Sequence, residues 1–167
     1  MITFQLIEAI KLVNYWLCIT NEDNWKVAKE RKIWGITKRA LGRNRKLLES
    51  VKPGDLLIFY VKPKRIAGLF ASTSNIFESY ERLFSSVGFD ADETFPYRLK
   101  LKPLIIPEKP IEFTPIVPKM TFIKKKKMWQ SSIYGRAMIK IPKNDYKIIR
   151  EEFKKALKGH TTFTESP

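Results

Sequence analysis

The chain has 167 residues, a length that fits one domain with a single hydrophobic core, and its 44% hydrophobic content excludes a disordered chain. The 32 Lys and Arg against 17 Asp and Glu leave a formal net charge of +15, which favours a polyanionic partner, most commonly nucleic acid. Its single cysteine, Cys18, excludes an internal disulfide framework and a cysteine-rich zinc site and indicates a reducing compartment, the cytoplasm.

The first 13 residues are apolar but contain charged side chains, and their apolar run is too short to span a bilayer. We read residues 1–13 as an N-terminal extension, with no membrane role. Residues 15–19 form an apolar run that predicts a buried first strand. Helix formers behind cap-type residues then predict a short helix.

Residues 33–35 read as a small extended apolar segment. The basic stretch KRALGRNRK follows, and its Gly42 and Asn44 predict a cationic surface loop. A turn of helix is expected after that loop, at Leu47 to Val51.

Two strands joined by a short polar connection are predicted in the middle of the chain. The turn at residues 52–55 precedes the run LLIFYV, and residues 66–72 are expected to pair with it in antiparallel fashion. Residues 77–95 read as a long irregular excursion of the kind that carries binding loops. The stretch YRLKLKPLII behind it alternates apolar and basic residues, as a half-exposed strand requires.

The last predicted element is a closing amphipathic helix with Tyr146, Ile149, Phe153 and Leu157 at helical spacing. Strands outnumber helices and are joined by short turns, so the expected fold class is α+β, a small mixed β-barrel with flanking helices. We expect one domain over residues 14–158 and a flexible tail over residues 159–167.

The side chains needed for catalysis are scarce. His160 is the single histidine and lies in the expected tail, and Cys18 reads as a small core residue. Asp90, Asp92 and Glu93 are close in sequence, but neighbouring acids in a loop are usually solvated. We therefore expect no enzyme, no metal site and no cofactor.

Several blocks in order along the chain resemble one known family. They are YWLCITNEDNW, IWG, VKPGDLLIFYV, IAGLF, FPYRLKLKP and KMWQSSIYGRAM. Together they strongly resemble the EVE domain, a PUA-like fold, over roughly residues 14–157. The EVE family is similar to the YTH domain, whose members read methylated adenine in RNA, and EVE members have been linked to modified bases in DNA.

The resemblance also implies a base-binding pocket. In the YTH pattern an asparagine precedes a cage tryptophan by ten positions, and Asn24 and Trp34 reproduce that spacing. By resemblance Asn24 hydrogen-bonds the edge of an extruded base, Trp34 forms one wall, and Gly35 lets the backbone approach the base.

The second cage tryptophan of YTH domains has no clear counterpart between residues 77 and 95, where other aromatic residues are available. The remaining candidates for the pocket are therefore Trp25, Phe84, Phe95, Tyr97 and Trp129. Trp129 could lie at the pocket rim or beneath it. Candidate phosphate-binding residues are Arg39, Arg43, Arg45, Lys124, Lys125, Lys126, Lys127 and Arg136.

The sequence thus predicts a reader that grips a DNA or RNA strand through basic loops and holds one flipped-out methylated cytosine or adenine in an aromatic pocket. One alternative is a general RNA-binding module of the PUA-like kind without selectivity for modification. A second alternative is a metal-dependent nuclease that uses the acidic residues near Asp90.

Overall fold

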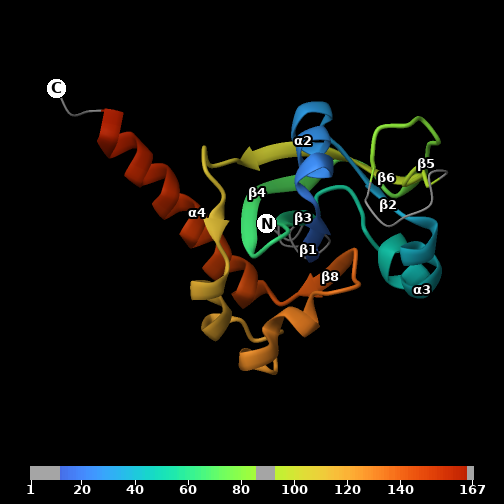
Figure 1. Cartoon of the computed structure of the whole chain (residues 1–167). Helices are drawn as coiled ribbons and strands as arrows, with labels where there is room; N and C mark the ends of the chain where they lie inside the picture. The colour runs from blue at the N-terminus through green and yellow to red at the C-terminus, as the bar shows by residue number, and fades with distance from the viewer. Residues whose placement is uncertain (1–11, 86–92, 165–167) are drawn as a thin grey trace, which may run out of the picture.

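The structure, a computed structural model, describes residues 12–85 and 93–164, and its centre is a curled mixed sheet (Figure 1). The order of the main strands is β2–β6–β4–β3–β1–β8, with β5 paired to β6 and β7 paired to β4. Their bounds are β1 Tyr15–Thr20, β2 Ile33–Ile36, β3 Leu56–Val61, β4 Arg65–Ser72, β5 Phe77–Glu78, β6 Tyr97–Ile105, β7 Ile111–Glu112 and β8 Met138–Ile141. The prediction of a small mixed barrel is confirmed.

Strand β1 lies inside the sheet, parallel to β3 and antiparallel to β8. The predicted hairpin is confirmed, because β3 and β4 pair in antiparallel register from Leu56↔Ala71 to Val61↔Arg65. The predicted strand at residues 97–106 is β6, which joins β4 on one side and β2 on the other.

Helices cover both faces of this sheet (Figure 1). They are α2 Glu22–Arg31, α3 Lys38–Glu49 and α4 Lys143–Thr164, with short 3₁₀ helices η1 Thr114–Lys119 and η2 Lys126–Ser132. Among the described residues, no helix has the length and apolar character needed to cross a membrane.

Alternating residues of the central strands supply two separate cores, because successive side chains of a strand point to opposite faces. Leu17 of β1 and Tyr60 of β3 pack with η1, η2 and α4 on one face. Trp16 of β1 and Phe59 of β3 pack with α2, β2 and α3 on the other. Both faces of β1 and β3 are therefore buried.

The basic loop predicted from Gly42 and Asn44 is wrong, since these residues lie within α3. The Thr37 hydroxyl caps this helix by accepting a hydrogen bond from the Ala40 N–H at 3.1 Å. Leu41 and Leu48, two turns apart, are buried against the sheet, and this burial outweighs the weak helix propensity of glycine and asparagine. Asn44 marks a kink, with φ −131° and ψ 32°.

The closing amphipathic helix is confirmed as α4, which buries Tyr146, Ile149 and Phe153. It continues through Gly159 to Thr164, where we expected a flexible tail. The N-terminal extension falls almost wholly outside the described residues.

A buried carboxylate ties the start of β1 to the turn before β3. Asp55 is fully buried and accepts hydrogen bonds from the Trp16 indole N–H at 3.0 Å and from the backbone N–H groups of Asn14 and Lys52 at 3.1 Å each. A buried polar group is costly when it has no hydrogen-bond partner. These three N–H groups share the Asp55 carboxylate as their acceptor, so the fold depends on this side chain.

Replacing Asp55 with alanine leaves these buried donors without an acceptor, and we expect the free energy of unfolding to fall by about 2–4 kcal/mol. Urea unfolding followed by circular dichroism measures the change. The control is Glu30→Ala, an exposed acid on α2. Equal stability of the two variants would contradict a structural role for Asp55.

Candidate functional site

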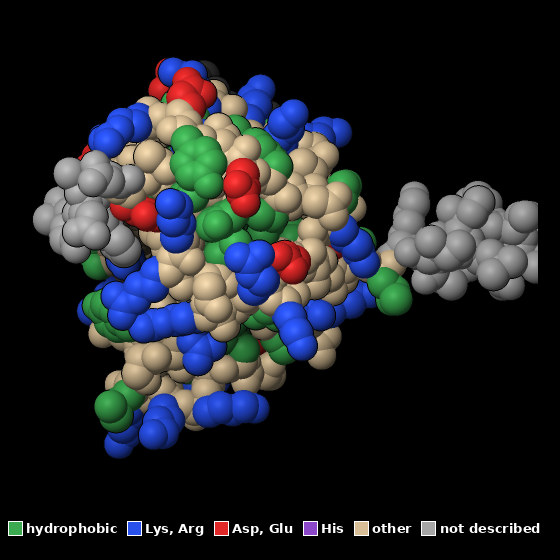
Figure 2. Space-filling view, turned by 90° about the vertical axis from the view of Figure 1, so that its right-hand side faces the viewer, with side chains coloured by type: hydrophobic (Ala, Val, Ile, Leu, Met, Phe, Trp, Pro, Cys, Tyr) green, Lys and Arg blue, Asp and Glu red, His purple; other side chains and the backbone are tan. Residues whose placement is uncertain are grey.

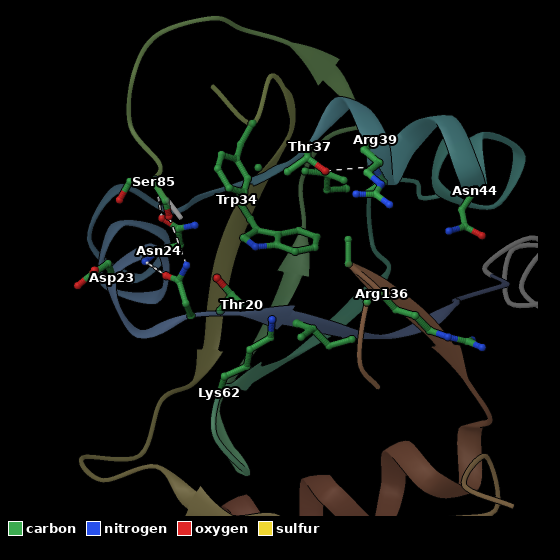
Figure 3. A pocket seen from close by; sticks show the side chains of 18 of the residues that line it. Thr20, Asp23, Asn24, Trp34, Thr37, Arg39, Asn44, Lys62, Ser85 and Arg136 are labelled. Atoms are coloured by element: carbon green, nitrogen blue, oxygen red, sulfur yellow. Dashed lines mark hydrogen bonds between the residues drawn. The ribbon is translucent and has the colours of Figure 1, made fainter. Parts of the chain in front are cut away.

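A cavity of about 810 Å³ opens at the carboxyl ends of the parallel strands β1 and β3 (Figure 3). Thr20 ends β1, Lys62 follows β3, and the Lys62 N–H donates to the Thr20 carbonyl at 3.0 Å. The start of α2, strand β2, the start of α3 and residues 135–137 before β8 complete its walls. Its volume lies in the range of small-molecule sites, about 300–1,000 Å³.

One end of the cavity is a network of side-chain amides at the start of α2. The side-chain oxygen Oδ1 of Asn21 accepts from the Asn24 backbone N–H at 2.8 Å and caps the helix, and Asn21 Nδ2 donates to the Ser85 backbone carbonyl at 3.3 Å. The Ser85 N–H donates to Asn24 Oδ1 at 2.9 Å. These bonds identify the oxygen of the Asn24 amide and orient its Nδ2 group.

Asn24 Nδ2 remains as a donor at the cavity. Among the described residues, no hydrogen bond involves Asn24 Nδ2, although Asn24 is only 4% exposed. A side-chain amide nitrogen donates two hydrogen bonds, so a ligand with an acceptor on its edge fits this position.

Trp34 lies between the amide end and the basic end of the cavity (Figure 3). Its ring packs edge-on against Phe59, with centroids 5.6 Å apart and planes at 88°, and only 2% of the residue is exposed. The resemblance implied that Trp34 forms one wall of a base pocket. In the structure Trp34 is among the residues that line the cavity, although it is almost fully buried.

Basic side chains form the other end of the cavity. Arg39 and Arg43 come from α3, Lys62 follows β3, and Arg136 precedes β8. All are exposed, and in the described part of the chain none of them takes part in an ion pair. Figure 3 shows Asp23 beside Asn24, on the opposite side of the cavity from Arg39 and Arg136, while Lys62 lies beside Thr20.

The predicted aromatic residues do not all meet at the cavity. Phe95 lines it, as Trp34 does. Trp25 packs against Phe59 and Phe70 in the same core as Trp34 but away from the cavity. Trp129 packs against Tyr60 and Phe113, in the core on the other face of the sheet.

Phe84 and Tyr97 also lie outside the lining. Tyr97 belongs to β6, pairs with Ile36 and packs on the core beside α3. Phe84 lies behind Gly35, where a Cβ atom would come within 2.8 Å of its ring and 2.7 Å of the Phe95 carbonyl oxygen. Gly35 does line the cavity, but its missing side chain makes room for these protein groups.

A buried arginine holds the segment that carries Phe84 and Phe95. The Arg98 guanidinium is fully buried and donates to the Phe95 and Thr94 carbonyls at 3.1 Å each, to Ser79 Oγ at 3.1 Å, and to the Glu81 carbonyl. It also lies 5.4 Å from the centre of the Phe84 ring. Burial lowers the pKa of Arg98, and the nearby Glu81 carboxylate opposes that shift. This single cation therefore joins both ends of the excursion over residues 79–95.

Other predicted phosphate-binding residues lie outside the lining of the cavity. Arg45 on α3 pairs with Glu49 at 3.1 Å. The run Lys124–Lys127 is exposed at the start of η2, and the Lys126 ammonium group donates to the Met120 carbonyl. Within the described ranges, no group of His, Cys, Asp and Glu could hold a metal. Asp90 and Asp92 lie outside the described residues, and Glu93 accepts from the Lys38 N–H at 3.1 Å.

The sequence analysis missed Thr20, Asn21, Lys62 and Ser85. Asn21 carried a signal, because asparagine is a preferred N-cap residue directly before a predicted helix. The sequence held no signal for Lys62 or Ser85. Lys62 reaches the cavity through the parallel pairing of β1 with β3, and Ser85 reaches it through the amide network.

The sequence matches one protein family and several of its members. The family model of the EVE domain matches residues 14–152. A UPF0310 protein of Pyrococcus abyssi is 41% identical over 146 residues, which cover 82% of this chain and 97% of the relative. A UPF0310 protein of Pyrococcus horikoshii is 37% identical over 149 residues, covering 83% and 98%.

Solved structures share the fold at low sequence identity. The Mmi1 YTH domain in complex with RNA aligns with a TM-score of 0.60 at 13% identity, over 89% of this chain and 82% of that one. The Pho92 YTH domain in complex with m6A aligns with a TM-score of 0.58 at 14% identity, over 85% and 84%. Human THYN1, in complex with 5-methylcytosine-containing DNA, aligns with a TM-score of 0.56 at 13% identity, over 81% and 95%. These likenesses place the chain in the PUA-like fold.

We expect Gly35→Ala to lower the free energy of unfolding by about 1–3 kcal/mol, because its new methyl group overlaps the Phe95 carbonyl and the Phe84 ring. Thermal or urea unfolding measures the loss. The matched control is Gly42→Ala within α3, where no heavy atom lies within 4 Å of the new methyl group. That change is expected to stabilise the helix by up to about 1 kcal/mol. A neutral Gly35→Ala would contradict the tight packing at this wall.

Proposed function

Because this chain belongs to the EVE domain family, we propose that it is a nucleic-acid-binding module whose cavity accepts one extruded base carrying a methyl modification. In this proposal the base is a methylated cytosine or adenine, and the protein binds it without catalysing a reaction. The cavity lining, as far as the structure describes it, contains no histidine or cysteine.

The observation that carries the proposal is the arrangement of groups around the cavity. An oriented amide donor at Asn24 lies at one end, exposed arginines lie at the other, and the Trp34 indole lies between them (Figure 3). A nucleotide has a complementary arrangement of groups. Its base offers a flat apolar surface and hydrogen-bond acceptors on its edge, and its phosphate carries the negative charge. The cavity can thus take the base at the amide end and leave the backbone beside the arginines.

The net charge of +15 and the surface support binding to a nucleic-acid strand. Figure 2 shows Lys and Arg side chains spread over the whole of one face, whereas acidic side chains are fewer and lie mainly in its upper half. The neighbours in complex with m6A and with 5-methylcytosine-containing DNA use the same fold for methylated bases, which motivates the choice of ligand.

Asn24→Asp tests the base contact. The substitution keeps an oxygen to accept from the Ser85 N–H but replaces the Nδ2 donor with a second acceptor. We expect affinity for oligonucleotides containing 5-methylcytosine or N6-methyladenine to fall about 10- to 100-fold, because a hydrogen bond is lost and two acceptors face each other. Fluorescence anisotropy with single- and double-stranded DNA and RNA measures the change.

Asn144→Asp is the matched control, since it makes the same charge change at an exposed position on α4. If Asn24→Asp bound the methylated oligonucleotides as tightly as the wild-type protein does, Asn24 would not contact the base. Equal affinity of the wild-type protein for methylated and unmethylated strands would instead favour the general RNA-binding module.

The phosphate contacts are tested by salt dependence. The double variant Arg39→Gln with Arg136→Gln removes two cations from the cavity, and we expect the slope of log K against log salt concentration to fall by about 1.4–1.8. Lys125→Gln with Lys127→Gln removes the same charge from η2 and its cap residue while leaving the Lys126 contact in place. We expect the slope to change less for this pair of lysine substitutions than for the arginine pair. A larger change of slope would indicate that the phosphate contacts lie at η2 and not at the cavity.

A further inference from the structure

A second, small hollow lies next to the cavity along the chain. It has a volume of about 40 Å³ and is lined by Tyr60, Lys62, Pro63, Gln130, Ile133 and Tyr134. Lys62 lines both hollows, and Tyr134 directly precedes Gly135 and Arg136, which line the cavity. The two hollows are therefore neighbours that share one lining residue.

Tyr134 differs from the other aromatic residues considered for binding. It is 65% exposed, whereas Trp34 and Trp129 are at most 9% exposed. Its backbone is nevertheless fixed, because the Tyr134 N–H donates to the Gln130 carbonyl at 2.9 Å and the adjoining Ile133 N–H donates to the same oxygen at 3.0 Å. The structure thus holds an accessible aromatic ring beside the cavity.

The other groups around this ring suit a nucleobase. Gln130 is half-buried, and no hydrogen bond of the described residues uses its side-chain amide, which can both donate and accept. Lys62 supplies a positive charge, and the residues lining the hollow include no carboxylate.

Extruding one base from a strand leaves its neighbour without a stacking partner. An exposed aromatic ring next to the pocket can replace that partner, and such a stack contributes about 1–3 kcal/mol. We propose that Tyr134, with Gln130 and Pro63, forms a second subsite that stacks the nucleobase adjacent to the one in the cavity. This inference rests on the proposed function.

The experiment uses fluorescein-labelled single strands of five nucleotides. The DNA strand carries 5-methylcytosine at its centre and the RNA strand carries N6-methyladenine there, with adenine at the other positions. Matched strands carry an abasic residue on one side or the other of the modified base. Fluorescence anisotropy gives the affinity of the wild-type protein and of Tyr134→Ala, Tyr134→Phe and Tyr80→Ala. Tyr80 is the matched control, because it is 55% exposed and lines neither hollow.

We expect the wild-type protein to lose about 5- to 100-fold in affinity when one of the two flanking bases is removed. Tyr134→Ala should show the same loss with the intact strand and no further loss with that abasic strand. Tyr134→Phe should bind as the wild type does, because the stacking ring remains, and so should Tyr80→Ala.

Three results would overturn the second subsite alone: wild-type affinity for the intact strand in Tyr134→Ala, no cost of removing either flanking base, or losses that add when both changes are made. In each of these cases Asn24→Asp would still weaken binding, so the proposed function would stand. Failure of the wild-type protein to bind any of the strands would overturn the proposed function and the subsite together. Thermal unfolding of Tyr134→Ala checks that its fold is retained, and the abasic strands test the subsite without any substitution.

Discussion

Burial of both faces of strands β1 and β3 is the constraint on which the rest of the structure depends. Except for Thr20, which lines the cavity, the side chains along these strands belong to one of two cores or pack against one, so aromatic residues can reach solvent only where a strand ends or a connection begins. The cavity lies at such a place, at the carboxyl ends of the parallel pair. The same constraint separates Trp34 from Trp129, because their partners Phe59 and Tyr60 are neighbours in β3 that face opposite ways.

The cavity is held open by interactions within the protein. Asn21 and Asn24 hold the backbone of Ser85, and the buried Arg98 guanidinium joins both ends of the excursion that carries Phe84 and Phe95. Groups fixed before a ligand arrives lose little conformational entropy on binding, which favours affinity and selectivity. The hydrogen bond from the Ser85 N–H thus fixes the orientation of the Asn24 amide within the protein.

Two kinds of interaction are available at this surface, one with long range and one that acts only in contact. In the proposed function, the arginines at one end of the cavity attract a phosphate backbone over a distance, and they do so regardless of base sequence. The buried amide and indole can distinguish ligands only at contact distance. Tyr134 is an exposed ring at the second hollow, and in the further proposal it adds a stacking contact to these two kinds of interaction.

Local patterns in the sequence predicted strands β1, β2, β3, β4 and β6 and the closing helix, because alternation and helical spacing are local properties of a chain. The family, and the choice of Asn24 and Trp34 as candidate site residues, came from the resemblance of several motifs to the EVE and YTH domains. The tertiary structure made the basic stretch helical, since burial of Leu41 and Leu48 outweighs local propensity, and it paired β8 with β1, which no local pattern predicted. It also decided that Trp25 and Trp129 pack in the cores while Lys62 and Ser85 reach the cavity. Such placements depend on strand pairing between distant segments, and no local pattern specifies which face of the sheet an aromatic residue will join.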